Sequence, residues 1–426
     1  MTKLRSPRLL VLMGLMALIA AACGGTAAAP DACESDPFGC VVIADGEPIS
    51  IGSLLVITGP NSSLGIDSQY GVELALDYNG DQAFDGVNTV IAGHTVELSP
   101  EDDGCSAEGG TAGANRLAAD AQIVAVIGTS CSSAALDVAD QIFSDKGISI
   151  VSPSNTGPAL TDPAKHKPFY LRTAHNDSIQ GAAVANFAFN ELGVTTAATI
   201  HDGSPYAEGL QGVFAEVFTS LGGTITTQEA VQVGQTDFNP VLTAIAAGEP
   251  EFLYYPIFVA EGGLITQQAR QTPGLEATLF AGSDGMFTPD WIDAAGADNA
   301  EGVYISGPDL SALSGDMAFY TDTFIPTYTE TYGAPQSVFH AHAWDATNMI
   351  LAAIEQVAID QDGTLYIPRT ALKDALFATS VLVGITGTLD CNENGDCQPS
   401  ATIAVVQVEG GAFSDTVYSE LGTLGG

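Results

Sequence analysis

Residues 123–133 read Ile-Val-Ala-Val-Ile-Gly-Thr-Ser-Cys-Ser-Ser, and residues 148–156 read Ile-Ser-Ile-Val-Ser-Pro-Ser-Asn-Thr. Each stretch is a short apolar run that ends in a loop of small hydroxylated residues. Short runs of this kind are typical of strands in a parallel sheet. Loops that leave the carboxyl ends of neighbouring parallel strands face a common crevice, where such sheets bind small ligands. The two stretches therefore predict half of a binding site.

The same alternation of strand and helix continues on both sides of these two stretches. Upstream we expect strands at 51–57 and 96–98 and helices at 68–79 and 109–121; downstream we expect strands at 197–201, 252–255, 278–281, 303–306 and 402–408, and helices starting at Asp177 and covering 206–221, 315–333 and 337–358. This order is typical of α/β folds with parallel sheets covered on both faces. Because 426 residues exceed what one core serves, we expect two similar lobes, with the chain returning to the first near Pro308.

The N-terminus has the features of an export signal. Lys3, Arg5 and Arg8 precede an uncharged run of small and apolar residues over 9–22, which is too short to span a bilayer as a helix. Small residues before Cys23-Gly24-Gly25 resemble a lipoprotein signal, in which residues 1–22 are removed and Cys23 is lipidated. Cleavage of a plain secretory signal nearby is the alternative.

The charge of the chain excludes some classes of partner. The formal net charge is −40, and removal of residues 1–22 takes away three basic and no acidic residues, which makes it −43. Nucleic acid is therefore excluded as a partner, because phosphate binding needs basic patches. Polybasic attachment to anionic lipid is equally disfavoured, so membrane contact is expected only through a lipid anchor.

Six cysteines remain besides Cys23, an even number in an oxidising compartment, which favours disulfide bonds. Spacing suggests three pairs, although the sequence alone allows about 15 connectivities. The suggested pairs are Cys33 with Cys40, Cys105 with Cys131, and Cys391 with Cys397. Residues 23–47 are rich in Gly, Ala, Pro and acidic residues and are predicted to form a flexible tether that carries the first of these loops.

Five segments occur in one order along the chain and resemble a known family. They are Ile51-Gly52 through Thr58-Gly59-Pro60, Asp102-Asp103-Gly104-Cys105, 128–133, 152–156, and 202–210 (Asp-Gly-Ser-Pro-Tyr-Ala-Glu-Gly-Leu). Together they resemble the leucine/isoleucine/valine-binding proteins, which are the substrate-binding subunits of branched-chain amino-acid ABC transporters. The resemblance extends over about residues 48–410.

The resemblance implies the type I periplasmic-binding-protein fold, an α/β architecture of two Rossmann-like lobes with parallel central sheets joined by three crossovers. A ligand is then closed between the lobes by hinge motion. We expect lobe 1 to comprise 48–174 and 309–400, and lobe 2 to comprise 175–308 and 401–426. The family disulfide matches the Cys105–Cys131 pair. The family also implies an ABC permease as partner, a monomer, and no cofactor, metal or enzymatic activity.

The resemblance assigns the amino-acid head group to the hydroxylated loops. It implies that Ser132 and the Thr156 N–H hold the carboxylate, and that the Ser154 carbonyl, Thr156 Oγ and Asp284 accept from the ammonium. The family more often has glutamate where this chain has Asp284. Independently of the family, a helix starting at Ser132 or Ser133, with Leu136, Ala139 and Phe143 facing inward, would offer free N–H groups and a partial positive charge. Ser132 as a helix cap and Asp284 as a turn residue are the alternatives.

Four further residues match family positions around the ligand. Tyr206 matches a tyrosine that reaches across the cleft, and Phe258 stands where the family often has tyrosine. Leu64 and Phe339 match the side-chain pocket. Because both are apolar, an aliphatic or aromatic ligand side chain is favoured over a charged one. Surface or core packing is the alternative for these residues.

Other functional signals in the sequence are weaker. Residues 390–396 imitate the opening of an EF-hand loop, but Ala401 stands where the bidentate glutamate belongs. His340 and His342 are two residues apart in a predicted helix, so they do not share a face and are expected to be structural. No GxSxG, HExxH, Walker or GxGxxG motif of an enzyme is present where it should be.

The sequence thus predicts an exported, lipid-anchored solute-binding protein, located at the outer face of the cell membrane or in the periplasm, that delivers a branched-chain or other apolar amino acid to an ABC permease. The same fold binding another small amide or carboxylate, such as urea, short amides or aromatic acids, is the first alternative. A ligand sensor that partners a membrane receptor is the second.

Overall fold

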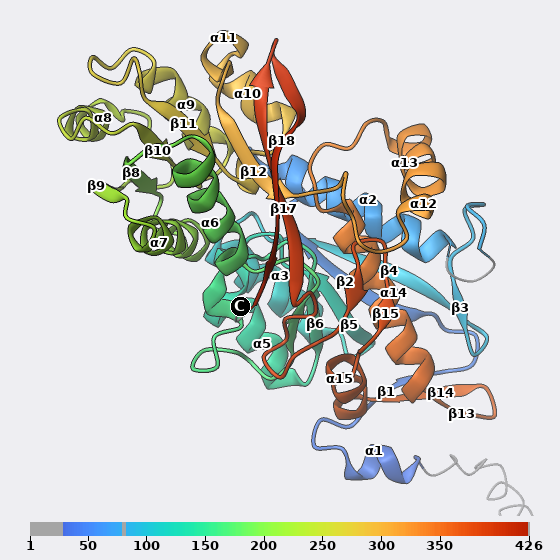
Figure 1. The fold of residues 1–426 in the computed structure, drawn as a ribbon. Coiled ribbons are helices and arrows are strands. Elements are labelled where there is room, and N and C mark those ends of the chain that lie inside the picture. The colour runs from blue at the N-terminus through green and yellow to red at the C-terminus, as the bar shows by residue number, and fades with distance from the viewer. Residues whose placement is uncertain (1–28, 79–81, 425–426) are drawn as a thin grey trace, which may run out of the picture.

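The apolar run Ile-Val-Ala-Val-Ile-Gly forms strand β5 (Ile123–Gly128), in which every residue is buried. The computed structural model describes residues 29–78 and 82–424 and places β5 inside a six-stranded sheet (Figure 1). The strand order is β3 (Val90–Ile91), β4 (His94–Asp102), β2 (Ile49–Leu55), β5, β6 (Ser149–Ser152) and β7 (Tyr170–Arg172). All neighbours pair in parallel except β3 with β4. The predicted parallel sheet is confirmed.

A second sheet of seven strands forms the core of the other lobe. Its order is β18 (Ala412–Thr423), β17 (Ser400–Glu409), β12 (Tyr304–Pro308), β11 (Leu279–Gly282), β10 (Phe252–Tyr254), β8 (Thr196–His201) and β9 (Thr224–Ala230). The strands from β9 to β12 are parallel, whereas β17 and β18 join as an antiparallel hairpin. The chain passes between the two sheets three times, after β7, after β12 and before β17, which confirms the α/β fold with two mostly parallel sheets.

Helices cover both faces of each sheet. Those of lobe 1 are α2 (Ser62–Tyr78), α3 (Ala107–Ala119), α4 (Ser132–Ala134), α5 (Asp140–Lys146), α12 (Met317–Phe319), α13 (Ile325–Tyr332), α14 (His340–Val357) and α15 (Arg369–Phe377). Those of lobe 2 are α6 (Asp177–Asn186), α7 (Pro205–Ser220), α8 (Asn239–Ala246), α9 (Val259–Ala269), α10 (Pro289–Ala295) and α11 (Ala297–Ala300). Two neighbouring β5 residues pack into different cores: Ile127 joins the core under α2 and α14, and Val126 joins the core under α3.

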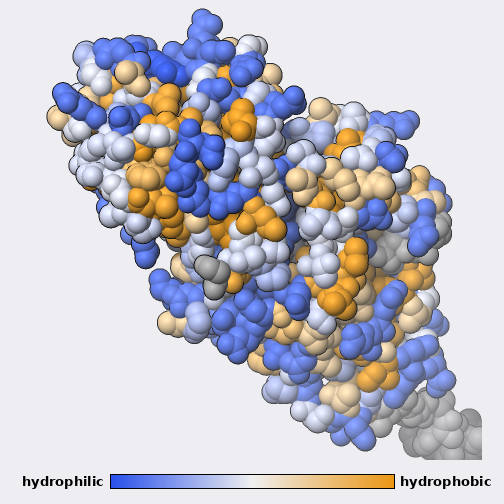
Figure 2. Space-filling model, in the orientation of Figure 1, coloured by the Kyte–Doolittle hydropathy of each residue, from blue (hydrophilic) through white to orange (hydrophobic). Residues whose placement is uncertain are grey.

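The surface agrees with the acidic composition of the chain. On the face shown in Figure 2, hydrophilic side chains cover large parts of both lobes and apolar patches are scattered between them. Within residues 29–78 and 82–424, no helix combines the length and the apolar character that a membrane span requires. The predicted export signal and Cys23 lie outside the described residues.

All three disulfides suggested by the cysteine spacing are present. They join Cys33 to Cys40, Cys105 to Cys131, and Cys391 to Cys397. The second braces the loop after β4 against the loop after β5, and the third closes a turn just before β17. A crosslink of this kind stabilises mainly by restricting the unfolded chain.

The prediction of a flexible tether over 23–47 is wrong for residues 31–43. This segment forms α1 (Asp31–Ser35) and β1 (Cys40–Ile43), and β1 pairs with β14 (Thr364–Pro368), which pairs in turn with β13 (Ile359–Gln361). A separate pair, β15 (Leu382–Val383) and β16 (Thr388–Leu389), lies nearby in sequence. The segment is ordered because Val41 and Ile43 are buried, at 2% and 0% exposure, in the core beneath α14 and α15.

We expect Ile43→Ala to lower the free energy of unfolding by about 2–4 kcal/mol, because it removes buried methyl groups and leaves a cavity. Its neighbour Val42 is 45% exposed on the same strand, so Val42→Ala should change stability by less than about 0.5 kcal/mol. Urea unfolding measures both values. Equal, small effects would mean that β1 does not belong to the folded core.

Candidate ligand-binding site

Two loops at the carboxyl ends of β5 and β6 are locked together by hydrogen bonds between small polar side chains. Ser152 Oγ donates to the Thr129 carbonyl at 2.7 Å, and Ser154 Oγ donates to the Ser130 carbonyl at 3.1 Å. In the opposite direction, the Gly157 N–H donates to Ser132 Oγ at 3.2 Å. Since Ser132 Oγ accepts this bond, its own O–H proton is left to donate into the cleft.

Asp103 holds the loop that follows β5 through hydrogen bonds to backbone N–H groups. Its carboxylate accepts from the Ser130 N–H at 2.6 Å and from the Cys105 N–H at 2.7 Å, so it ties both ends of the Cys105–Cys131 bridge together. Burial raises the pKa of Asp103 to about 7, although these N–H donors act in the opposite direction. The loop is therefore held by short polar contacts and a disulfide, as a rigid binding surface requires.

The predicted long helix after Ser132 is interrupted. Helix α4 covers only Ser132–Ala134, and the chain kinks at Leu136 and Asp137, where Asp137 has φ +57°. Ala139 and Phe143 are fully buried beyond the kink, whereas Leu136 is only partly buried. A three-residue helix has little macrodipole, so the attraction for an anion at this end comes from local N–H and O–H donors.

The second half of the site is a hydrogen-bond network around Asp284. Asp284 Oδ1 accepts from Tyr206 OH at 2.9 Å and from Gln180 Nε2 at 2.8 Å. Tyr206 OH also accepts from the Gly285 N–H at 3.1 Å, and Gln180 Oε1 accepts from His175 Nε2. Tyr206 and Asp284, which the sequence placed on the second lobe, therefore lie in direct contact.

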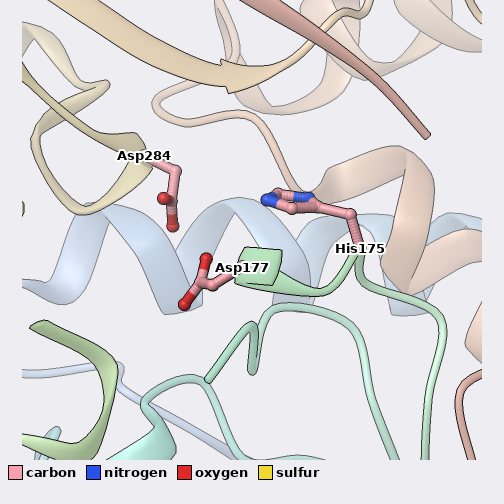
Figure 3. Close-up of side chains that lie close together, drawn as sticks. All are labelled: His175, Asp177 and Asp284. Carbon is pink, nitrogen blue, oxygen red and sulfur yellow. The ribbon is translucent and has the colours of Figure 1, made fainter. Parts of the chain in front are cut away.

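Asp177, His175 and Asp284 point toward one another (Figure 3), with one potential ligand atom from each lying within 4.8 Å of the others. Asp177 is fully buried and Asp284 is 5% exposed. In the described part of the chain, neither oxygen of Asp177 is within hydrogen-bond geometry of a partner, and the same holds for Thr156 Oγ1 and His175 Nδ1. The Thr156 hydroxyl nevertheless lies near enough to Asp177 to act against the rise in the pKa of its carboxyl group. Unpaired buried acceptors are costly, so this cluster is prepared for a hydrogen-bond donor or a cation.

Electrostatics within the cluster point the same way. Burial raises the pKa of Asp177 well above its ordinary value, and the nearby charge of Asp284 raises it further. Burial also raises the pKa of Asp284 to about 6, against the bonds from Gln180 and Tyr206. Burial lowers the pKa of His175 to about 4, so this ring is neutral at pH 7. Two carboxyl groups thus lie close together in one buried site. The charge of Arg172 lowers the pKa of Asp177 from a distance, but among the described residues no cationic side chain forms an ion pair with either aspartate.

A metal ion and an ammonium group are the two cations that such a cluster could hold. His175, Asp177 and Asp284 are the residues that would bind a metal. However, His175 Nε2 already donates to Gln180, which leaves only Nδ1 for a metal, and Asp284 Oδ1 already accepts two bonds. An ammonium group needs only the free oxygens of Asp177 and Thr156 and the second oxygen of Asp284. Its three N–H donors match that set.

The structure brings the predicted pocket residues together. Leu64, Tyr206, Phe258 and Phe339 belong to one apolar cluster. The Tyr206 and Phe258 rings lie 5.1 Å apart, and Phe339 stacks on His175 at 6.1 Å. Apolar surface therefore adjoins the polar cluster of His175, Asp177 and Asp284, which we call the head-group cluster. Ser132, Ser154 and Thr156 are buried as well.

The two lobes touch around the site. Thr288 Oγ1 of lobe 2 donates to Ser63 Oγ of lobe 1 at 3.2 Å. Beside this contact lies a cavity of about 330 Å³ that residues of both lobes line. Lobe 1 contributes Asn61, Cys105 and Ser133, and lobe 2 contributes Pro205, Phe258 and Glu261. The two lobes are therefore in direct contact at Ser63 and Thr288 and share the lining of one cavity.

Sequence reasoning missed three residues of the cluster. It placed Asp177 only at the start of a helix. Asn176 caps that helix, α6, by accepting from the Ser178 N–H at 2.9 Å, so the Asp177 side chain is not used for the cap. His175 and Gln180 carried no pattern at all. The sequence signal that could have pointed to Asp177 is the pair Asn176-Asp177 at a helix start. Only one of two adjacent capping residues is needed for the cap, so the other can have a different role.

Comparison with known proteins identifies relatives along almost the whole chain. A sequence profile described as "Periplasmic binding protein" matches residues 48–412. Leu/Ile/Val-binding protein homolog 3 of Brucella melitensis is 27% identical over 350 residues, which is 82% of this chain and 88% of that protein. The crystal structure of a leucine-binding protein from Thermotoga maritima has a TM-score of 0.75 and 26% identity, with 87% of this chain and 98% of that chain covered.

A more distant structure has the same fold with another ligand. It is a solute-binding protein of an ABC transporter from Rhodopseudomonas palustris in complex with benzoate, with a TM-score of 0.71 and 19% identity over 87% of this chain and 96% of that chain. The fold therefore accommodates different small molecules between its lobes. Because the profile match extends over most of the sequence and the two-lobed architecture agrees with it, the chain belongs to the periplasmic binding protein family.

Proposed function

We propose that this protein is an exported solute-binding protein that captures an α-amino acid, branched-chain or otherwise apolar, and delivers it to an ABC permease. The observation that carries the proposal is the buried carboxyl group of Asp177, whose two oxygens have no hydrogen-bond partner among the described residues and which lies beside the buried carboxyl group of Asp284. An ammonium group satisfies both of them. The relatives named for leucine, isoleucine and valine support the same class of ligand.

The ligand's two charged groups would occupy opposite sides of the loops. Its carboxylate would accept from the Ser132 hydroxyl and the Thr156 N–H, and its ammonium would donate to Thr156 Oγ1, the Ser154 carbonyl and the two aspartates. The family commonly has a longer glutamate at the position of Asp284. Asp177 compensates for that missing methylene, because it supplies a second carboxylate from the start of α6.

The apolar residues would then select the ligand's side chain. Leu64, Phe258 and Phe339 offer no charged or hydrogen-bonding group, which favours an aliphatic or aromatic side chain. A ligand that contacts Ser132 on lobe 1 and Asp284 on lobe 2 stabilises only the closed arrangement of the lobes. Binding would therefore shift a pre-existing open–closed equilibrium.

The main alternative is a carboxylate or amide without an amino group, such as the benzoate bound by the Rhodopseudomonas palustris structure. Such a ligand could use the donors of the hydroxylated loops. It would leave Asp177 and Asp284 without a cation, which is why we favour an amino acid. A ligand sensor that partners a membrane receptor would use the same capture geometry and differs only in its downstream partner.

A thermal-shift screen tests the ligand class. We expect purified residues 30–426 to melt at a higher temperature with millimolar L-leucine, L-isoleucine or L-valine, because a ligand that binds only the folded state stabilises it by mass action. The matched control is 4-methylpentanoate, which is leucine without its amino group, and it should give no shift. A response to benzoate, urea or 4-methylpentanoate with none to any α-amino acid would reject the proposal.

Asp177→Asn should raise stability without ligand and lower affinity for the amino acid. Because burial raises the folded-state pKa of Asp177, the unfolded chain ionises first, and the wild type loses stability as pH rises above about 4. The variant does not lose this stability. The difference in free energy of unfolding between the variant and the wild type should therefore be close to zero below about pH 4. Above that pH it should grow by up to about 1.4 kcal/mol per pH unit until Asp177 ionises in the folded state. Urea unfolding between pH 4 and 8 measures it.

Calorimetry with L-leucine provides the second readout. Affinity should fall at least tenfold in Asp177→Asn and in Asp284→Asn, because each removes an anionic partner of the ammonium group. Glu355, an exposed residue on α14, supplies the control. Glu355→Gln should change neither property. Unchanged affinity in both aspartate variants would show that the ammonium site lies elsewhere.

Lipidation of Cys23 is part of the proposal and has its own test. The full-length protein expressed in a bacterium should partition into the detergent phase of a Triton X-114 extract, because one or more acyl chains bind detergent micelles. The Cys23→Ala variant should remain in the aqueous phase. Aqueous partition of the unaltered protein would favour a plain secretory signal.

A further inference from the structure

Arg172 is a fully buried cation at the last position of β7, directly behind the second binding loop. Its Nη1 donates to the carbonyls of Asn155, at 3.1 Å, and Gly157, at 3.0 Å, and its Nη2 donates to Thr161 Oγ1 at 2.7 Å. The two carbonyls belong to the residues on either side of Thr156. A single guanidinium group thus binds the backbone carbonyls on both sides of Thr156.

The counter-charge for Arg172 comes from a distant part of the chain. Asp396 Oδ1 accepts from Arg172 Nε at 2.6 Å, and Asp396 is only 5% exposed. Asp396 lies in the loop that the Cys391–Cys397 disulfide closes. The backbone of this loop is attached to the same arginine, since the Arg172 N–H donates to the Gly395 carbonyl at 2.9 Å and the Cys397 N–H donates to the Arg172 carbonyl at 3.0 Å.

Two side chains of the segment that resembles a calcium loop, Asn392 and Asp396, already accept hydrogen bonds from protein groups. Asn392 Oδ1 accepts from the backbone N–H groups of Asn394 and Asp396, at 2.9 and 3.1 Å. Gly395 lies against β7, where an added Cβ would come within 2.3 Å of the Tyr170 carbonyl. The hairpin therefore has a specific docking place at the end of β7, and its polar groups hold its shape and the arginine.

We infer that the hairpin of residues 391–397 is a positioning device for the ligand loop. Asp396 neutralises Arg172, which allows a charged guanidinium to remain in a dry site, and Arg172 fixes the carbonyls of Asn155 and Gly157. Thr156 is thereby held where its N–H and Oγ1 face the ligand. Arg172 and Asp396 are positioning residues and do not touch the ligand. The inference rests on the proposed assignment of residues 154–157 to the ligand site.

Preorganisation of this loop has a functional consequence. A loop that is already fixed loses little conformational freedom when the ligand binds, so affinity is higher than for a mobile loop with the same contacts. Release of the hairpin should therefore loosen residues 155–157 and weaken binding, although no ligand contact has been altered.

Two disulfides of similar loop length provide a matched experiment. Cys391 and Cys397 are six residues apart, and Cys33 and Cys40 are seven apart, also in lobe 1 but outside the binding loops. Hydrogen exchange of the unliganded protein should be at least tenfold faster over 153–158 in Cys391→Ser/Cys397→Ser. The Cys33→Ser/Cys40→Ser variant should leave this segment unchanged. Unchanged exchange in the first variant, or equal acceleration in both, overturns the inference.

Single substitutions in the same hairpin test the ion pair with the disulfide intact. Asp396→Asn should weaken L-leucine binding at least tenfold and accelerate exchange over 153–158. Asp390→Asn removes an exposed charge a few residues away and should do neither. Ile43→Ala lowers stability without altering a residue of 391–397 or 153–158, so it controls for a general loss of folding. If Ile43→Ala weakens binding as much as Asp396→Asn at temperatures well below melting, the positioning role is rejected.

The exchange measurement keeps this inference separate from the proposed ligand. If the unaltered protein does not bind L-leucine, the proposed function fails, but exchange over 153–158 still reports whether the hairpin holds the loop. If leucine binds and exchange is unaffected by Asp396→Asn, the proposed function stands and the positioning role fails.

Discussion

The buried guanidinium of Arg172 connects the parts of lobe 1 that must stay in register. It ends β7, the last strand before the chain first crosses to the other lobe, and it bonds to the binding loop and to the hairpin that precedes the last crossing. A buried charge tolerates little displacement, because its desolvation must be offset by well-placed partners. The constraint on this one group therefore fixes the binding loop and two interlobe connections relative to each other.

The head-group cluster differs from Arg172, because one of its buried ionisable groups has no hydrogen-bond partner among the described residues. Asp103 and Asp284 have partners in the folded protein, whereas Asp177 keeps two oxygens without one in the described residues. Burial raises the pKa of its carboxyl group, which costs stability above about pH 4, and on the proposed assignment an ammonium group bound there would offset part of that cost. Sites of this kind commonly sacrifice stability for function. The rigid loop and the strained cluster are complementary, since a mobile loop could relax to satisfy Asp177 by itself.

Most of the fold was predictable because its signals are local. Apolar runs such as 123–128 identified the parallel strands, and the small hydroxylated residues after them form the two hydrogen-bonded loops that we assign to one side of the proposed site. The N-terminal strand was missed because Val41 and Ile43 lie in an acidic, Gly- and Ala-rich context, and their partner β14 follows more than 300 residues later. Asp177 was missed because the sequence cannot show which of two adjacent capping residues caps the helix. The kink at Asp137 likewise depends on a backbone conformation that residue types do not reveal.

The net negative charge of the chain affects an approaching ligand only over a limited distance. With a net charge of −40 over the full sequence, the surface repels an anion, but salt screens this field within about 10 Å at ordinary ionic strength. Inside the cleft only short-range partners remain effective. A zwitterion suits such a protein, because its net charge is zero and it meets little long-range repulsion on approach. On the proposed assignment, a simple carboxylate would meet the carboxyl groups of Asp177 and Asp284 at the site, so the local geometry would favour an amino acid over a simple carboxylate.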